Sequence, residues 1–302
     1  MQGGLNKRIM AKKVLILGAK GSLGDQLVKV FTENKKIEVI PWDKEEIDIT
    51  DQGLLAKKIK EIKPAIIINA AAFNVVDKCE EEEGSRLAMK INGQAPGFLA
   101  QAALAVGAIL IHYSSDYVFN GKKRQGYTEE DEPKPISKYG ESKLAGEQGI
   151  IRLSGRGLKW YLIRTQKLFG PKGASELAKP SFFDTMLKLS ETKDAFDLVN
   201  EELGCFTYTP DLAEATRKLI DENRGFGIYH IVNPGPATWY VAAKKLFELA
   251  GKKVKLTPVP ASKFPRPARR PKYSILINTK LEPLRPWQAA LEKYLKIRNQ
   301  AV

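Results

Sequence analysis

Short apolar runs alternate with amphipathic stretches over the first 165 residues, and this alternation constrains the fold more than any other feature. The predicted strands lie at 13–17, 37–41, 65–68, 108–113 and 160–164. The predicted helices between them, with apolar residues at helical spacing, lie at 23–31, 54–62, 84–105 and 135–153. The continuously apolar run at 65–68 is typical of a parallel strand covered on both faces. The pattern therefore predicts an α/β fold, a Rossmann-like doubly wound parallel sheet with right-handed crossovers.

The alternation loosens after Arg164, and the second half of the chain reads as a smaller lobe. Further amphipathic helices are predicted at 182–189, 211–221, 240–250 and 287–296. Between Pro258 and Pro271 five prolines stand in a basic context, which is too irregular for a helix. We predict a dinucleotide-binding domain at 11–165. We predict that 166–302 is mainly a substrate-binding lobe, with some segments returning to the first domain.

Composition narrows the class of protein. The 302 residues are 43% hydrophobic, which suffices for a substantial core. No apolar run approaches the roughly 20 residues that span a bilayer, and the start of the chain does not read as a signal peptide. We therefore expect a cytoplasmic protein without a membrane partner. Cys79 and Cys205 cannot build a disulfide framework. His112 and His230 stand in apolar strand-like runs, so we expect packed structural roles for them and no histidine-rich metal site.

The formal net charge of +14 does not decide the function by itself. Lysine and arginine neutralise nucleic-acid phosphates, but here they are scattered along the chain and often stand beside glutamates, as on a solvated surface. The clearest local excess lies at 266–272. A positive field would equally attract a nucleotide diphosphate or a dinucleotide cofactor. We therefore expect no nucleic-acid partner, and a shift of generic duplex DNA would contradict that expectation.

Three glycines, Gly18, Gly21 and Gly24, separate the first predicted strand from the first predicted helix. Glycine lets the backbone turn tightly and approach a pyrophosphate, whose charge then meets the helix N-terminus. The spacing is G-x-x-G-x-x-G, and no Gly-Lys-Ser/Thr closes it, so it is not a P-loop. The setting between a strand and a helix favours a nucleotide site over a plain turn.

Asp43 stands at the end of the second predicted strand. A carboxylate there can accept hydrogen bonds from the adenosine ribose hydroxyls and repels a 2′-phosphate, which favours NADH. Lys44 follows directly and can pair with such a phosphate. Both NADH and NADPH therefore remain open as cofactors. A third possibility is that Asp43 and Lys44 are only a surface pair in a turn and bind no cofactor.

Tyr139 and Lys143 are four residues apart on a predicted helix, so their side chains share one face. A nearby ammonium, helped by an oxidised nicotinamide ring, favours phenolate, and we expect the two charges to lower the pKa of Tyr139 from about 10. The phenol could then protonate a carbonyl oxygen as hydride reaches the carbon. Ser115 and Asp116 follow a predicted strand, at the edge where open α/β sheets bind ligands, and a hydroxyl there could hold the carbonyl oxygen. Together with the glycine loop, these features indicate an NAD(P)-dependent oxidoreductase.

The sequence resembles the dTDP-4-dehydrorhamnose reductase family, an extended branch of the short-chain dehydrogenases/reductases. The likeness lies in the runs 69–72, 76–80, 113–119, 139–147, 238–240, 267–271 and 285–288, and it covers nearly the whole chain beyond the first dozen residues. The resemblance implies hydride transfer from NADH or NADPH to the C4 keto group of a dTDP-activated deoxysugar. It also implies a catalytic triad of Ser115, where the family has threonine, with Tyr139 and Lys143.

The candidate residues form two sets, drawn partly from the motifs and partly from the resemblance. The cofactor set is Gly18, Gly21, Ser22, Leu23, Gly24, Asp43, Lys44, Asp48, Ile49, Ala70, Ala71, Ala72, Tyr139 and Lys143. The substrate set is Val76, Ser115, Asp116, Lys167, Arg269 and Arg270. Guanidinium groups suit a diphosphate because their donors form a planar fork. The resemblance leaves Mg²⁺ at a dimer contact open, but no ligands for it are identifiable. The helix-rich second lobe leaves room for a homodimer.

Two departures from the family pattern concern the substrate. The family usually has Arg-Thr-Ser-Trp where this chain has Arg164, Thr165, Gln166 and Lys167, and the run 200–207 matches only loosely. An ammonium in place of an indole could change the sugar. The alternatives are therefore a reductase or epimerase of another nucleotide sugar, and a cofactor-binding regulatory subunit resembling the β subunit of methionine adenosyltransferase.

Overall fold

The computed structural model describes residues 12–176 and 178–300. Its centre is a six-stranded parallel sheet in the order β2-β1-β3-β4-β5-β9. The strands are β1 (Lys12–Leu17), β2 (Ile37–Trp42), β3 (Ile66–Asn69), β4 (Ile109–Ser115), β5 (Lys159–Thr165) and β9 (Gly227–His230). From β1 the chain goes to β2 on one side of it and then to β3 on its other side, from which the later strands continue outward. The direction in which strands are added therefore reverses beside β1. In open α/β sheets, ligands bind outside the carboxyl ends of the strands at this reversal.

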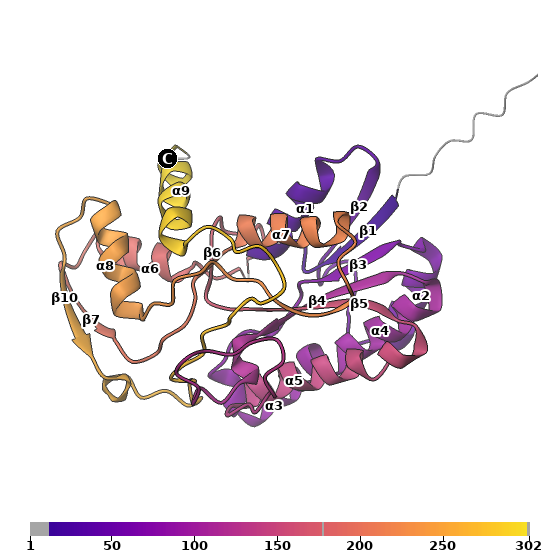
Figure 1. Cartoon of the computed structure of the whole chain (residues 1–302), viewed down its shortest axis with the longest axis horizontal. Helices are drawn as coiled ribbons and strands as arrows, with labels where there is room; N and C mark the ends of the chain where they lie inside the picture. Colours follow the sequence, from indigo (N-terminus) through magenta and orange to yellow (C-terminus); the bar gives the residue numbers. More distant parts are fainter. Residues whose placement is uncertain (1–11, 177, 301–302) are drawn as a thin grey trace, which may run out of the picture.

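Helices cover both faces of the sheet (Figure 1). Successive side chains of a strand point to opposite faces, so Val14 and Ile16 belong to one core and Leu15 and Leu17 to the other. The first core is covered by α1 (Ser22–Thr32) and α7 (Thr209–Asp221). The second is covered mainly by α2 (Gln52–Ile62) and α4 (Ala95–Val106), and α5 (Lys138–Ile151) packs beside α4. The predicted doubly wound parallel sheet is confirmed.

The second lobe has its own small core of aromatic and aliphatic side chains. Its helices are α6 (Phe182–Leu189), α8 (Trp239–Leu249) and α9 (Trp287–Gln300). Two short parallel sheets join them: β7 (Ala195–Val199) pairs with β10 (Lys255–Val259), and β6 (Leu168–Phe169) pairs with β8 (Thr207–Tyr208). Figure 1 shows this lobe beside the carboxyl ends of the central strands. The second half of the chain also supplies β9 and α7 to the central layers.

The long helix predicted at 84–105 is wrong in its middle. The chain forms α3 (Glu82–Ala88), then a π-helical stretch at Met89–Gln94, and only then α4. The wider turn places the Asn92 side chain on the backbone of Phe73, where its Oδ1 accepts from the Phe73 N–H at 2.9 Å and its Nδ2 donates to the Phe73 carbonyl at 2.9 Å. This tertiary contact has no counterpart in helical periodicity. It ties the helix to the loop that follows β3.

The remaining differences are at element ends and in the second lobe. The helix predicted from Pro135 begins at Lys138, because the Ser137 hydroxyl accepts a hydrogen bond from the Gly140 N–H at 3.2 Å and caps it. The strands β6, β7, β8 and β10 were not predicted. The proline-rich stretch contains a single 3₁₀ turn at Ala261–Lys263. Cys79 and Cys205 are free and buried, and His112 and His230 are buried as expected.

In the part of the chain that the structure describes, no helix combines the length and apolar character needed to cross a membrane.

A buried ion pair joins the helix α5 to the strand β5. Arg164 donates from Nε to Glu147 Oε1 at 3.0 Å and from Nη2 to Glu147 Oε2 at 2.7 Å, and both side chains are 1% exposed. The Arg164 guanidinium also lies 5.0 Å from the centre of the Phe119 ring. Two parallel charge-assisted bonds fix both distance and orientation.

We predict that Glu147→Gln lowers the free energy of unfolding by about 3–5 kcal/mol, because it leaves the Arg164 charge buried without its counter-ion. Urea unfolding followed by circular dichroism measures the change. Glu141→Gln on the same helix is the matched control, since Glu141 pairs with Lys138 at the exposed surface and the unfolding midpoint should stay in place. Equal midpoints for both variants would contradict the prediction.

Candidate active site

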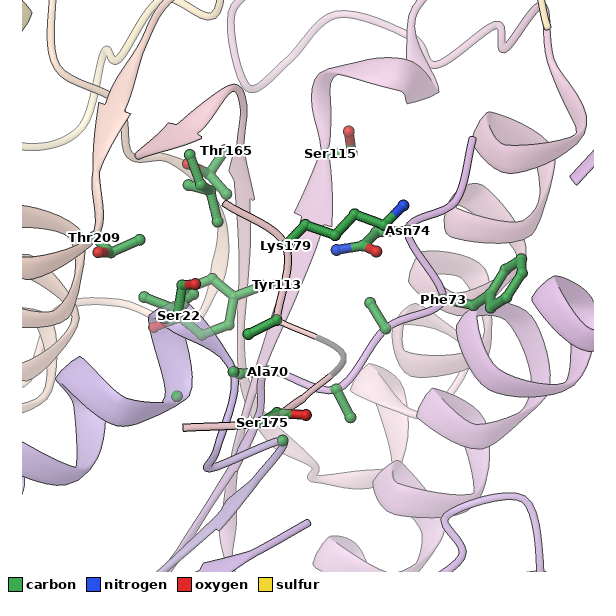
Figure 2. A pocket seen from close by; sticks show the side chains of 18 of the residues that line it. Ser22, Ala70, Phe73, Asn74, Tyr113, Ser115, Thr165, Ser175, Lys179 and Thr209 are labelled. Carbon is green, nitrogen blue, oxygen red and sulfur yellow. The ribbon is translucent and has the colours of Figure 1, made fainter. Parts of the chain in front are cut away.

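A cavity of about 1010 Å³ extends along the carboxyl ends of the central strands and continues toward the second lobe. Its walls come from the glycine loop, the segments after β2, β3, β4 and β5, the helix α5 and the segment 170–182. Figure 2 shows Ser22, Ala70, Tyr113, Ser115 and Thr165 around it. The volume lies at the upper end of the range for small-molecule sites.

The glycine loop brings the start of α1 close to the end of β1. A Cβ atom on Gly24 would lie 2.0 Å from the Gly18 carbonyl oxygen, so only glycine allows this approach. The first N–H groups of any α-helix have no intrahelical partners. In α1 the capping residue is Gly21, which has no side chain to accept from them. Such N–H groups and the helix dipole bind anions. The loop therefore fits the pyrophosphate of a dinucleotide.

Asp43 lies beside the glycine loop at the end of β2. Its Oδ2 accepts from the Lys20 N–H at 2.9 Å, and its Oδ1 accepts from the Lys44 N–H at 2.9 Å. Glu46 accepts from the Asp43 N–H at 2.7 Å, and Glu45 holds the Lys20 ammonium at 3.0 Å. Asp43 and Lys44 both line the cavity. Three carboxylates and two ammonium groups thus gather at this end, where negative charge is in excess.

The remaining predicted cofactor residues also line the cavity: Gly18, Ser22, Leu23, Asp48, Ile49, Ala70, Ala71 and Ala72. Asn69 holds the start of the alanine run, since its Oδ1 accepts from the Ala71 N–H at 3.2 Å. Its Nδ2 lies 3.1 Å from Nδ1 of His112 on the neighbouring strand. His112 is fully surrounded by protein, and burial lowers its pKa well below the usual value. A neutral imidazole can accept the Asn69 amide proton, so this histidine supports the cofactor wall from behind.

Ser115, Tyr139 and Lys143 line the same cavity from two elements. Ser115 ends β4, and the other two lie one turn apart on α5. The Lys143 ammonium donates to the Tyr113 carbonyl at 2.7 Å, and burial lowers its pKa to about 8. The Tyr139 ring meets Tyr117 edge-on with the centroids 5.3 Å apart.

In the protein alone, without the nicotinamide charge that the sequence prediction included, the pKa of Tyr139 is raised and not lowered. Burial raises the pKa of this phenol, and the negative charge of Asp116 raises it further, while a hydrogen bond with Ser115 acts against both. The i, i+4 spacing suggested that Lys143 would lower this pKa, but the ammonium is bonded to the Tyr113 carbonyl, and desolvation dominates. The phenol is therefore protonated at neutral pH.

Asp116 lines the cavity next to Ser115. The Ser115 hydroxyl donates to Asp116 Oδ1 at 2.9 Å and accepts from the Tyr117 N–H at 3.2 Å. Burial raises the pKa of Asp116 above its usual value, although hydrogen bonds from Gln166, Ser274 and Ser115 act in the opposite direction. Gln166, which departs from the family pattern, is buried here and donates to the Ser274 carbonyl at 2.8 Å. It joins the strand end to the segment near 274.

Lys167 places a cation against Trp239, an aromatic residue that also lines the cavity. Its ammonium donates to the carbonyls of Glu202 at 3.1 Å and Ala237 at 3.4 Å, and it lies 4.4 Å from the centre of a Trp239 ring. Burial lowers its pKa to about 8, while the charges of Asp116 and Glu202 act in the opposite direction. Its φ of 41° lies in the left-handed region, which costs about 1–2 kcal/mol in a residue with a Cβ.

Arg269 and Arg270, predicted to bind substrate, do not line this cavity. Arg270 donates to both carboxylate oxygens of Asp77, at 2.5 and 2.7 Å. Within the described ranges, Arg269 is exposed and forms no side-chain hydrogen bond or ion pair. Val76, Asp116 and Lys167 of the same set do line the cavity. For Arg270, Asp77 accounts for the difference, because it holds the guanidinium outside the cavity.

The sequence did not point to several residues that line the cavity. These are Asn74, Gln166, Lys172, Lys179, Phe182, Phe206 and Trp239. Phe182, Phe206 and Trp239 form one aromatic wall, with centroid distances of 4.8 Å between Phe182 and Trp239 and 5.4 Å between Phe206 and Trp239. The sequence signal for Trp239 is the run 238–240, which indicates the family resemblance but not a place in the cavity wall. Among residues 12–176 and 178–300, no group of three or more His, Cys, Asp or Glu side chains could hold a metal ion.

Comparisons with known proteins agree with this site. The family model described as RmlD substrate binding domain matches residues 12–299. The spore coat polysaccharide biosynthesis protein SpsK of Bacillus subtilis is 38% identical over 293 residues, which cover 96% of this chain and 99% of SpsK.

Two solved structures are similar over nearly all of both chains. A dTDP-4-dehydrorhamnose reductase of Clostridium acetobutylicum has 40% identity and a TM-score of 0.87, with 95% of this chain and 99% of that one covered. A dTDP-4-dehydrorhamnose reductase of Bacillus anthracis, in complex with NADP, has 35% identity and a TM-score of 0.88, covering 95% of this chain and 100% of that one. The chain with its Rossmann-like sheet and Ser-Tyr-Lys cavity therefore belongs to the dTDP-4-dehydrorhamnose reductase family.

Proposed function

We propose that this chain reduces the C4 keto group of a dTDP-activated deoxysugar with NADH or NADPH, and that dTDP-4-dehydrorhamnose, which would give dTDP-L-rhamnose, is its substrate. The observation that carries the proposal is the meeting of Ser115, Tyr139 and Lys143 in one cavity with the glycine loop. The relatives named dTDP-4-dehydrorhamnose reductase support the substrate, and the relative solved with NADP supports a nicotinamide cofactor.

The residues of this chain divide the reaction between them. A reduced nicotinamide, when bound, supplies hydride to the C4 carbon. Tyr139 donates its phenolic proton to the C4 oxygen, so hydride and proton together convert the ketone into the alcohol. Burial raises the pKa of this phenol, so it is protonated before the carbonyl oxygen gains negative charge. The Ser115 hydroxyl donates its single proton to Asp116 Oδ1 at 2.9 Å and can accept from the Tyr139 phenol, so it orients the phenol. To hold the carbonyl oxygen as well, the hydroxyl would have to turn its proton from Asp116 to the substrate.

Lys143 and the glycine loop hold the cofactor in this proposal. The ammonium is fixed by the Tyr113 carbonyl at the carboxyl end of β4 and retains donors for a ribose hydroxyl. The first turn of α1 meets the pyrophosphate. Asp43 would accept from the adenosine ribose.

We predict that Tyr139→Phe lowers kcat by about 10²-fold or more, since it removes the proton donor and keeps the ring. NADH oxidation, followed by absorbance with enzymatically generated dTDP-4-dehydrorhamnose, measures kcat. The Kd of NADH should stay within about twofold, because the ring remains in place. Tyr240→Phe, outside the cavity, is the matched control and should keep full turnover. Undiminished turnover by Tyr139→Phe would contradict the mechanism.

We predict that NADH has a higher kcat/KM than NADPH, because the excess of carboxylates near Asp43 disfavours a 2′-phosphate. Steady-state rates with both cofactors measure the ratio. Asp43→Asn should improve NADPH relative to NADH by about tenfold, and Lys44→Gln should weaken NADPH alone, since Lys44 is the ammonium that could pair with the phosphate. A wild-type preference for NADPH that Asp43→Asn leaves unchanged would refute this assignment.

Lys167 sets a pH dependence for sugar-nucleotide binding. Below its pKa of about 8 the ammonium is charged and can donate to the ligand; as pH rises through 8 the charge and one donor are lost. We therefore predict that the KM of the sugar nucleotide rises above pH 8. The groups that face Lys167 are Asp116, Glu202 and Cys205, whose charges influence its titration.

The test compares pH profiles of KM and kcat for the wild type and Lys167→Met. In Lys167→Met the KM should be higher and flat across pH 8, while any change in kcat from Lys143, whose pKa is also about 8, persists in both proteins. Identical KM profiles would exclude the role of Lys167. If the chain binds NADH but reduces no keto-sugar, the regulatory-subunit alternative replaces the reductase proposal.

A further inference from the structure

Within the segment 170–181, between β6 and α6, the residues 173–175 pack directly on the glycine loop. The Ser175 N–H donates to the Lys20 carbonyl at 2.9 Å, and the Gly173 N–H donates to the Ser22 hydroxyl at 3.4 Å. A Cβ atom on Gly173 would lie 2.3 Å from the Lys20 carbonyl oxygen, so the two backbones touch here. The segment therefore forms a wall of the cavity next to the site that fits a pyrophosphate.

Two lysines on this wall line the cavity, Lys172 and Lys179. In the described part of the chain, neither forms a side-chain hydrogen bond or an ion pair, and both are exposed. Figure 2 shows the Lys179 side chain extending across the cavity toward the loop that carries Asn74. The segment has one carboxylate, Glu176, which does not line the cavity. Both ammonium groups can thus meet a ligand.

The other cations near the cavity have partners or lie elsewhere. Lys143 donates to the Tyr113 carbonyl, and Lys167 donates to two carbonyls beside Trp239. Arg270 is held by Asp77 outside the cavity. Lys44 lies at the adenosine end. Among the described cations that line the cavity between the glycine loop and the aromatic wall, Lys172 and Lys179 are therefore the ones whose ammonium groups form no hydrogen bond or ion pair.

We propose that Lys172 and Lys179 bind the two diphosphates of the reaction, in place of the Arg269–Arg270 pair that the family resemblance suggests. Lys172, next to the contact between Gly173 and the glycine loop, binds the cofactor pyrophosphate. Lys179, which reaches toward the Asn74 loop, binds the diphosphate of the sugar nucleotide. Only the identity of the second ligand rests on the proposed function.

The test measures binding without turnover, with NADH and dTDP as separate probes. Fluorescence titration gives the Kd of NADH, and calorimetry gives the Kd of dTDP, for the wild type, Lys172→Gln, Lys179→Gln and Arg269→Gln. Lys179→Gln should raise the Kd of dTDP about tenfold and leave NADH within about twofold, and Lys172→Gln should do the reverse. Added NaCl should weaken dTDP binding less in Lys179→Gln than in the wild type, because salt screens the lost pairing.

Arg269→Gln is the matched control, an exposed cation outside the cavity whose loss should change neither Kd. Lys179→Arg keeps the positive charge and should bind dTDP as the wild type does. If Lys179→Gln weakened binding only by disturbing the loop, keeping the charge would not restore it. Unchanged Kd values in both lysine variants, or weaker dTDP binding in Arg269→Gln alone, would overturn the proposal. Wild-type protein that binds NADH but not dTDP would overturn the assignment of Lys179. Normal binding of both probes without reduction of any keto-sugar would refute the proposed function and leave the lysine assignment standing.

Discussion

The position of the helix α5 on the sheet determines whether this cavity can carry out chemistry. Tyr139 and Lys143 lie at the start of that helix, whereas the hydroxyl that they must meet lies at the end of β4. The buried pair of Glu147 with Arg164 holds the helix one to two turns further along, on the strand next to β4. Since the pair is bidentate, it fixes the rotation of the helix as well as its distance. The placement of Tyr139 and Lys143 beside Ser115 therefore depends on an ion pair whose two residues do not line the cavity.

A second set of contacts holds the same helix from the other side. The π-helical stretch places Asn92 between the loop after β3 and α5, where its Nδ2 lies 3.1 Å from the Ser142 hydroxyl. Ser142 in turn donates to the Tyr139 carbonyl at 2.7 Å. The cofactor wall and the catalytic helix are thus joined through one buried amide. The π-helical stretch at Met89–Gln94 thus carries the residue that makes both contacts.

The sequence was informative where the physical cause is local. Apolar runs, helical spacing and the glycine triplet depend on neighbouring residues, and the central sheet with its flanking helices followed from them. The cavity position of Ser115 followed from the rule that parallel strands present their carboxyl ends at one edge. Tyr139 and Lys143 were found by their spacing on one helix, and the family resemblance grouped them with Ser115. The π-helical stretch, the capture of Arg270 by Asp77 and the carbonyl ligands of Lys167 depend on partners far away in the chain. Periodicity and spacing contain no information about such partners.

The pKa of Tyr139 shows what such distant partners can change. The spacing to Lys143 suggested a lowered pKa, as a base that accepts a proton during oxidation would need. In the folded chain the Tyr113 carbonyl takes up the ammonium, and burial with the nearby Asp116 charge raises the pKa instead. Burial and the Asp116 charge keep the phenol protonated, as donation to a carbonyl oxygen requires, but they also make it a weaker acid. Proton transfer from Tyr139 therefore depends on the negative charge that develops on the carbonyl oxygen as hydride arrives.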